Sequence, residues 1–271
     1  MTAPMLSLQL QGLGFWATRL TSWPAARAAF RGETTLQPDA PRRPAPALLP
    51  AAERRRAPDS VALALQVAAE AVAAAGVDPA HCPSVFTSAY GDLALLDNLC
   101  STLAQAPALL SPTRFHNSVH NAAAGYWTIA TGCRAPSSAV SAWRHSFAAG
   151  LLEAATQCLA DHTPVLLVAC DAPSAGAMAS VASSEGLLGV AMVLAPPTGS
   201  GGVARLALQA APSCGEATHA KTAAARAQAG NAMADALPLC EALAAAAPAT
   251  VQLLLGRGSA LQLQLSFEST R

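Results

Sequence analysis

Alternating apolar and polar positions predict strands near both ends of the chain. Residues 6–10 show the period of a half-buried strand, which we expect to end in a turn at Gly12 and Gly14. Toward the other end, alternating residues 251–255 and 261–265 flank the turn signal Gly-Arg-Gly-Ser at 256–259. This pattern is typical of a β-hairpin.

Helical and strand patterns alternate between these two ends. Asp59 or Ser60 is expected to cap a helix that runs through Ala75 and ends at Gly76. Further helices are predicted over 93–105, about 118–131, 146–160 and about 235–246, and strands over 84–89, 137–143, 164–169 and 186–194. The alternation favours an α/β layered fold with a largely parallel sheet.

The segment 23–58 interrupts this pattern. Prolines recur at positions 24, 38, 41, 44, 46, 50 and 58, and each one fixes φ and removes a backbone donor. We therefore expect a long Pro- and Arg-rich surface loop without persistent regular structure. Its arginine run, 54–56, is interpreted as a solvated loop rather than an anion site.

Composition narrows the class of protein. Charged residues make up 12% of the chain and balance to zero, whereas hydrophobic residues make up 52%; about 25% charge is usual. Disorder is therefore excluded for most of the chain, and a nucleic-acid or membrane partner is not expected. A neutral surface poor in charge favours contact with another chain. We expect a cytoplasmic protein without a spanning helix, because no apolar stretch is long enough.

Metal and cofactor signals are weak. The seven cysteines include no C-x-x-C pair. His116 and His120 are four residues apart, but the surrounding segment offers no third ligand, so we interpret them as ordinary hydrogen-bonded histidines. Gly12-x-Gly14 resembles a dinucleotide fingerprint without the amphipathic helix that it requires, and a strand-to-loop turn is favoured. The sequence predicts no metal and no cofactor.

The chain passes sharply from strand to helix at residues 141–146, where α/β enzymes often present a nucleophile. Ser141, His145 and Ser146 lie in this turn, but the spacing seldom aligns a base with a hydroxyl. We favour Ser146 as a helix N-cap. A stand-alone acyl hydrolase or transferase that uses Ser141 or Ser146 with His145 remains the alternative.

Several motifs in chain order resemble the β-ketoacyl synthases, the condensing enzymes of the thiolase fold. Residues 10–14 resemble the family's first strand with its G-L-G turn, and 54–76 resemble its arginine-led, alanine-rich helix. The run from Ser111-Pro112 through Asn121, Gly125, Thr128-Ile129 and Gly132-x-Arg134-x-Pro136-Ser137 follows the family's S-P…N…A-G…T-I…G-x-R-G-P-S pattern without a gap. The resemblance covers about residues 6–195.

This resemblance implies a truncated thiolase-like α/β fold, a single domain over 1–271. It comprises a thiolase-like half at about 6–195 and a C-terminal helix and hairpin at about 203–268. The family's nucleophilic cysteine would align with Arg144, which cannot act as a nucleophile. The family's catalytic histidines belong to a second half that this sequence lacks, so no catalytic residue is assigned.

Without the family's nucleophilic cysteine, the sequence resembles the chain-length factors, which are the non-catalytic partners of ketosynthases. The segment 118–125 is similar to the short chain-length-factor-like proteins of aryl-polyene pigment pathways. The resemblance implies a heterodimer with a full-length β-ketoacyl synthase, served by an acyl carrier protein, with contacts through 137–142 and 118–131. The interface or tunnel candidates are Phe115, His116, His120, Asn121, Trp127, Ser141 and Trp143.

Two alternatives stay open beside this prediction. The small side chains at 122–125 could serve close approach of a partner or dense packing within one chain. Phe115 and Trp127 could likewise be ordinary core residues. A homodimeric acyl-binding module without a ketosynthase partner is a further possible function.

Overall fold

The sheet is the frame of the molecule. The computed structural model describes residues 5–197, 202–213 and 215–267, so that Cys214 and residue 268 of the expected extension lie outside the described residues. The strands are β1 (Leu6–Ala17), β2 (Ser84–Thr87), β3 (Ser137–Val140), β4 (Val165–Asp171), β5 (Leu188–Ala195), β6 (Ala204–Pro212), β7 (Ala249–Gly256) and β8 (Ser259–Ser266). They form one sheet in the order β3-β2-β4-β5-β1-β6-β8-β7.

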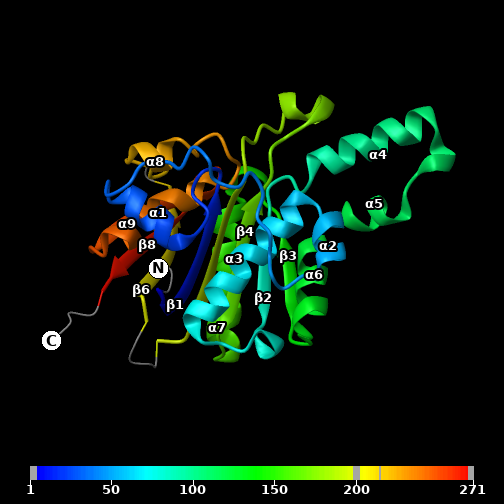
Figure 1. Cartoon of the computed structure of the whole chain (residues 1–271). Helices are drawn as coiled ribbons and strands as arrows, with labels where there is room; N and C mark the ends of the chain where they lie inside the picture. Colours follow the sequence, from blue (N-terminus) through cyan, green and yellow to red (C-terminus); the bar gives the residue numbers. More distant parts are fainter. Residues whose placement is uncertain (1–4, 198–201, 214, 268–271) are drawn as a thin grey trace.

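Helices cover both faces of this sheet (Figure 1). They are α1 (Trp23–Phe30), α2 (Ala51–Arg56), α3 (Asp59–Ala75), α4 (Leu93–Gln105), α5 (Pro112–Asn117), α6 (Ala122–Thr131), α7 (Ser146–Asp161), α8 (Ala223–Arg226) and α9 (Leu237–Ala245). Helices α3 and α6 share one hydrophobic core with the sheet, whereas α1, α7 and α9 share the other. Helix α7 also contacts the distant strand β7.

The prediction of a largely parallel sheet is wrong. Only the pairs β2–β3 and β2–β4 are parallel, and the other neighbours run antiparallel. The chain returns from β4 to β5 through residues 172–187, which contain a 3₁₀ turn at Gly176–Ser180 but no crossover α-helix. Without such a crossover the next strand cannot lie parallel to its predecessor in the same sheet. Strand β6, which the sequence analysis missed, continues this antiparallel part.

Strand β1 does not end at its glycines, as the sequence analysis expected, but continues through them to Ala17. A Cβ atom on Gly12 would lie 2.2 Å from the carbonyl oxygen of Ala71 in α3, and one on Gly14 would lie 2.0 Å from that of Val67. These glycines therefore let the helix approach the strand closely. The turn expected at this G-x-G is wrong, because the glycines lie within a continuous strand.

Helix α3 has the predicted bounds and ends at Gly76 in the left-handed conformation, φ +65°. The predicted cap is wrong, since Pro58 occupies the N-cap position and no side chain caps the helix. Asp59 instead pairs with Arg43 at 2.8 Å, and the Ser60 hydroxyl donates to Asp92 at 2.9 Å. Both side chains thus hold neighbouring segments against the start of the helix.

The Pro-rich segment contains more regular structure than expected, because α1 and α2 form within it. Ser22 caps α1 and Pro24 lies in its first turn, where the missing N–H removes no helical hydrogen bond. The arginine run 54–56 lies in the last turn of α2, where cations interact favourably with the helix dipole.

Helices α4 and α5, joined by the short 3₁₀ turn Pro107–Leu109, project from the body (Figure 1). We call residues 93–117 the arm. Helix α4 has the predicted bounds, but the run expected over 118–131 is helical only from Ala122, because α5 ends at Asn117. The C-terminal hairpin β7–β8 is confirmed. Among the described residues, no helix has the length and apolarity needed to cross a membrane.

Candidate functional site: the elbow, the arm and the open sheet edge

The parallel strands β2, β3 and β4 end side by side, next to the start of α7. The connection between β3 and α7, residues 141–145, is the elbow identified in the sequence. Strand β3 is shorter than the predicted strand 137–143, since it ends at Val140 and a 3₁₀ turn covers Trp143–His145. The elbow is therefore a tight turn between an edge strand and a core helix.

Trp143 occupies a strained position in the elbow. Its φ is +51°, which is uncommon for a bulky residue, and its side chain is 55% exposed. The guanidinium of Arg144 lies 5.0 Å from the centre of the indole ring, within the range of a cation–π contact. The elbow thus carries an exposed cation stacked on an exposed ring.

The serines of the elbow are bound to backbone atoms. Ser146 is fully buried in the first turn of α7, where its hydroxyl donates to the Trp143 carbonyl at 2.6 Å and accepts the Ala142 N–H at 2.9 Å. The N-cap residue is His145, so the predicted cap role of Ser146 is wrong. Because its hydroxyl is buried and used on both sides, Ser146 is not placed to attack a substrate.

Ser141 donates its hydroxyl to the Ala89 carbonyl at 3.2 Å. The Nδ1 atom of His145 is buried and has no hydrogen-bond partner among the described residues. Burial raises the pKa of Asp235, and the nearby charges of His145 and His219 partly offset this effect. Because Ser141 bonds to the Ala89 carbonyl and the His145 Nδ1 atom has no partner among the described residues, the serine–histidine pair needed for a stand-alone hydrolase is not assembled.

None of the described cysteines belongs to the elbow. Burial raises the pKa of the Cys82 and Cys158 thiols to about 11, and raises the pKa of Cys170 and Cys240 still further. Within the described part of the chain, the exposed cysteine is Cys100 on the arm. A thiolate nucleophile is not formed readily at the buried positions.

A buried carboxylate that the sequence analysis missed joins the strand ends. Asp171, the last residue of β4, accepts hydrogen bonds from the Ser88 hydroxyl at 2.9 Å, the Ala89 N–H at 2.7 Å and the Tyr90 N–H at 3.2 Å. Burial raises its pKa to about 6, although these three donors oppose the shift. The only sequence signal was a carboxylate that ends a continuous apolar strand.

The two histidines separate rather than converge. His116 lies on the exposed side of α5, whereas His120 follows α5 and its Nε2 contacts the Ser88 carbonyl at 3.2 Å. Asn121 precedes α6 as its N-cap residue, with no capping bond from its side chain. In the described residues, no group of three or more His, Cys, Asp or Glu side chains is arranged to hold a metal ion.

Two large side chains of this region differ sharply in burial. Phe115 on α5 is 60% exposed, but Trp127 on α6 is fully buried against α3. The core-packing alternative therefore describes Trp127. Two residues further along α6, Ile129 is 82% exposed, and a Cβ atom added to Gly125 would meet nothing within 4 Å. Helix α6 thus presents a small, apolar outer face at Gly125 and Ile129.

The two edges of the sheet are treated differently. Along β7, the Thr218 N–H donates to the Gln252 carbonyl and the Gln252 N–H to the Thr218 hydroxyl, both at 2.9 Å, so a loop covers that edge. Strand β3 forms the other edge, and of the described strands it pairs with β2 alone. An open edge of this kind is a template for pairing with another chain.

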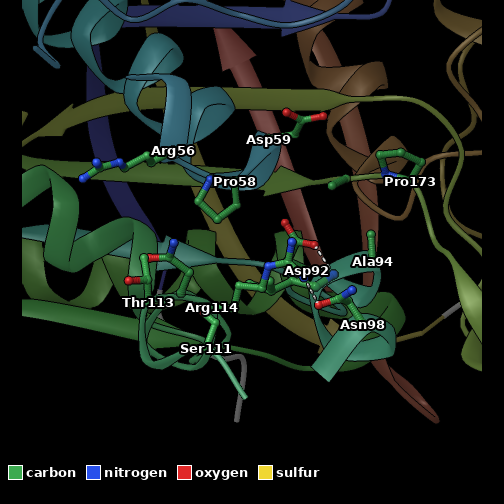
Figure 2. A pocket seen from close by; sticks show the side chains of 13 residues that line it. Arg56, Pro58, Asp59, Asp92, Ala94, Asn98, Ser111, Thr113, Arg114 and Pro173 are labelled. Carbon is green, nitrogen blue, oxygen red and sulfur yellow. Dashed lines mark hydrogen bonds between the residues drawn. The ribbon is translucent and has the colours of Figure 1, made fainter. Parts of the chain in front are cut away.

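A cavity of about 540 Å³ lies at the base of the arm (Figure 2). Arg56, Pro58 and Asp59 line it from the body, Asp92 lines it just before the arm, and Asn98 and Arg114 line it from the arm, among others. Arg114 of α5 donates to the side-chain oxygen of Asn98 of α4 and so joins the two arm helices. The arm is therefore internally connected but incompletely packed against the body.

The chain thus combines a layered α/β fold with an elbow between an edge strand and a core helix. The family profile described as the β-ketoacyl synthase N-terminal domain matches residues 25–259. The chain belongs to this family. No curated protein matches the sequence significantly.

Solved structures with the same fold include ketosynthase complexes. One is the ketosynthase ApeO in complex with its chain length factor ApeC from Xenorhabdus doucetiae, with 23% identity, a TM-score of 0.73, and coverage of 96% of this chain and 99% of the matched chain. A second is the ishigamide ketosynthase/chain length factor, with 16% identity, a TM-score of 0.69, and coverage of 97% and 100%. The predicted thiolase-like fold, one ketosynthase-like half, is confirmed.

A third structure is AntDE:AntF, a type II acyl-carrier protein in complex with its ketosynthase. It shares 10% identity with this chain at a TM-score of 0.74, with coverage of 98% of this chain and 99% of the matched one. At these identities the similarity shows the fold.

Proposed function

We propose that the chain is a non-catalytic, chain-length-factor-like partner of a β-ketoacyl synthase. It acts in the cytoplasm in a bacterial type II fatty acid or polyketide pathway of the aryl-polyene kind, and an acyl carrier protein delivers substrate to the shared complex. Two of the similar structures, each a ketosynthase with its chain length factor, support this assignment.

The open edge of β3 beside the exposed face of α6 is the observation that carries the proposal. The Ser84 N–H donates to the Pro136 carbonyl and the Ser88 N–H to the Val140 carbonyl, so alternate residues of β3 direct their backbone toward β2. The backbone groups of Ala139 therefore point away from the sheet. A strand of a partner can pair with them while α6 packs beside it.

The elbow supports a partner without chemistry of its own. Arg144 stands at the position that aligns with the family's cysteine, and a guanidinium does not deprotonate in proteins. Condensation would then belong entirely to the ketosynthase. His116, His120, Asn121, Ser141 and Trp143 are proposed to contribute to the shared interface around this elbow.

Phe115 is the proposed determinant of product length. Its ring is exposed on α5, in a segment that resembles the family's interface region, so it can project into a tunnel formed jointly with the partner. A large aromatic ring at the end of such a tunnel fills space that a growing acyl chain would otherwise occupy.

Co-expression with a full-length β-ketoacyl synthase from the same organism tests the proposal. A one-to-one complex is expected, with an obligate-type interface of more than about 2,000 Å². Ala139→Pro removes an N–H that faces the open side and should abolish the complex, whereas Ala139→Val keeps the N–H and should preserve it. A monomer that does not bind the synthase, or a complex that still forms with Ala139→Pro, would contradict the proposal.

A further inference from the structure

The arm has little packing to fix its angle to the body. Helix α4 buries only Leu93 and Leu99, and α5 buries only Asn117. The cavity at its base further separates the arm from α2 and α3 (Figure 2). Outside the arm, helix α4 packs chiefly on the 3₁₀ turn Gly176–Ser180 among the described elements, so the direction of the arm depends on this contact and on the polar contacts at the two ends of the arm.

The first end of the arm is held by the carboxylate of Asp171. Its two oxygens accept from the Ser88 hydroxyl and from the consecutive N–H groups of Ala89 and Tyr90, and the Ser88 oxygen in turn accepts the Gly91 N–H at 2.8 Å. Hydrogen bonds to a carboxylate are stronger than neutral ones, so this segment is held firmly to the end of β4.

The same short segment also holds the other end of the arm and the elbow. His120, which follows α5, contacts the Ser88 carbonyl at 3.2 Å, and Ser141 of the elbow donates to the Ala89 carbonyl at 3.2 Å. Three segments that are far apart in the sequence therefore meet on Ser88 and Ala89. We call Asp171, Ser88, Ala89, His120 and Ser141 the junction.

We propose that the junction positions the arm relative to the elbow and the open β3 edge, and thereby sets the product length of the ketosynthase complex. Asp171 and Ser88 act as positioning residues, because they hold the segment from which α4 departs and do not themselves face the partner. The consequence is that Phe115 meets the shared tunnel at one depth. This inference rests on the proposed function.

Two alanine substitutions remove hydrogen bonds of the junction. Ser88→Ala removes one donor to Asp171 and the acceptor of the Gly91 N–H, and Ser141→Ala removes the link to the elbow. Ser88→Thr retains the hydroxyl and serves as the conservative control. Ser213→Ala, which removes a 3.0 Å hydroxyl bond to Gly215 in the C-terminal part of the chain, is the matched control for loss of a serine hydroxyl.

Hydrogen–deuterium exchange in the purified complex gives the first readout. Loss of two hydrogen bonds near a carboxylate is expected to raise the opening of the arm about tenfold in Ser88→Ala. Exchange across residues 93–117 should therefore accelerate, while β4 and β5 keep their protection. Ser88→Thr and Ser213→Ala should match the unmodified chain.

The product distribution gives the second readout, which a merely structural residue would not change. Ser88→Ala is expected to broaden the range of chain lengths at an unchanged ratio of chain to synthase, and Ser88→Thr should restore the narrow range. Ser141→Ala, at the proposed interface, should broaden the range as well, whatever its effect on assembly. If Ser88→Ala assembles normally and keeps the original arm exchange and product range, the positioning role is refuted while the proposed function stands. If the unmodified chain forms no complex, the proposed function fails first.

Discussion

Trp127 and Ile129, two residues apart on α6, should respond in opposite ways to substitution. Trp127 is fully buried against α3, and Ile129 is 82% exposed. Trp127→Ala is therefore expected to lower the free energy of unfolding by about 3–5 kcal/mol, because it leaves a large cavity. Ile129→Lys should leave it nearly unchanged, since lysine is a good helix former and a cation suits the last turn of a helix.

Binding to the ketosynthase should show the reverse order. Full burial of an isoleucine side chain contributes about 2 kcal/mol, so Ile129→Lys should weaken the complex at least about 30-fold, with the buried ammonium group adding to the loss. Urea denaturation of the chain and titration of the synthase by calorimetry measure the two effects separately. Ile129→Leu is the matched control and should leave both nearly unchanged.

The reasoning would be refuted if Ile129→Lys bound the synthase as tightly as the unmodified chain. The outer face of α6 would then be solvated in the complex. A loss of stability in Ile129→Lys comparable to that of Trp127→Ala would also contradict it, because Ile129 would have to be part of the core of the chain.

Three further outcomes are expected. Gly14→Ala should destabilise the isolated chain by several kcal/mol in urea denaturation, since its Cβ would lie 2.0 Å from the Val67 carbonyl oxygen, and near-normal stability would contradict the close contact. Asp171 binds a proton more tightly in the folded chain, where its pKa is about 6, than in the unfolded chain. Its contribution to the free energy of unfolding, up to about 3 kcal/mol, is therefore fully present below about pH 4 and is lost as the pH rises through about 6. The difference in stability between the unmodified chain and Asp171→Asn should follow this pH dependence, and a difference that does not change with pH would refute the raised pKa. Phe115→Ala should lengthen the product in mass spectrometry at a condensation rate within about tenfold, and an unchanged product from an assembled complex would remove Phe115 from length control.

Local pattern was sufficient for the elements whose partners lie close in sequence. The bounds of α3 and α4 and the hairpin β7–β8 follow from periodicity and from turn residues such as Gly76. The direction of β5 did not follow, because it depends on whether residues 172–187 contain a crossover helix. The close approach of α3 to Gly12 and Gly14 is likewise a tertiary contact, which no local signal distinguishes from a turn.

In the candidate site too, the sequence pattern predicted local features but not contacts between distant segments. The order of motifs placed Arg144 at the elbow and identified the family, but helix α6 is apolar around most of its circumference, so periodicity could not decide that Trp127 faces inward and Ile129 outward. The junction at Asp171 was missed because its donors, Ser88 to Tyr90, lie more than eighty positions away in the sequence. Such contacts are determined by strand order, which the sequence pattern alone does not provide.

Native mass spectrometry of the chain co-expressed with a full-length β-ketoacyl synthase from the same organism tests the central claim most directly. We predict a one-to-one heterodimer in which acyl groups from the carrier protein are found on the synthase alone and never on this chain, with Ala139→Pro yielding two separate proteins. A chain that stays apart from the synthase, or that carries a stable acyl adduct at Ser141, Ser146 or a cysteine, would contradict the account.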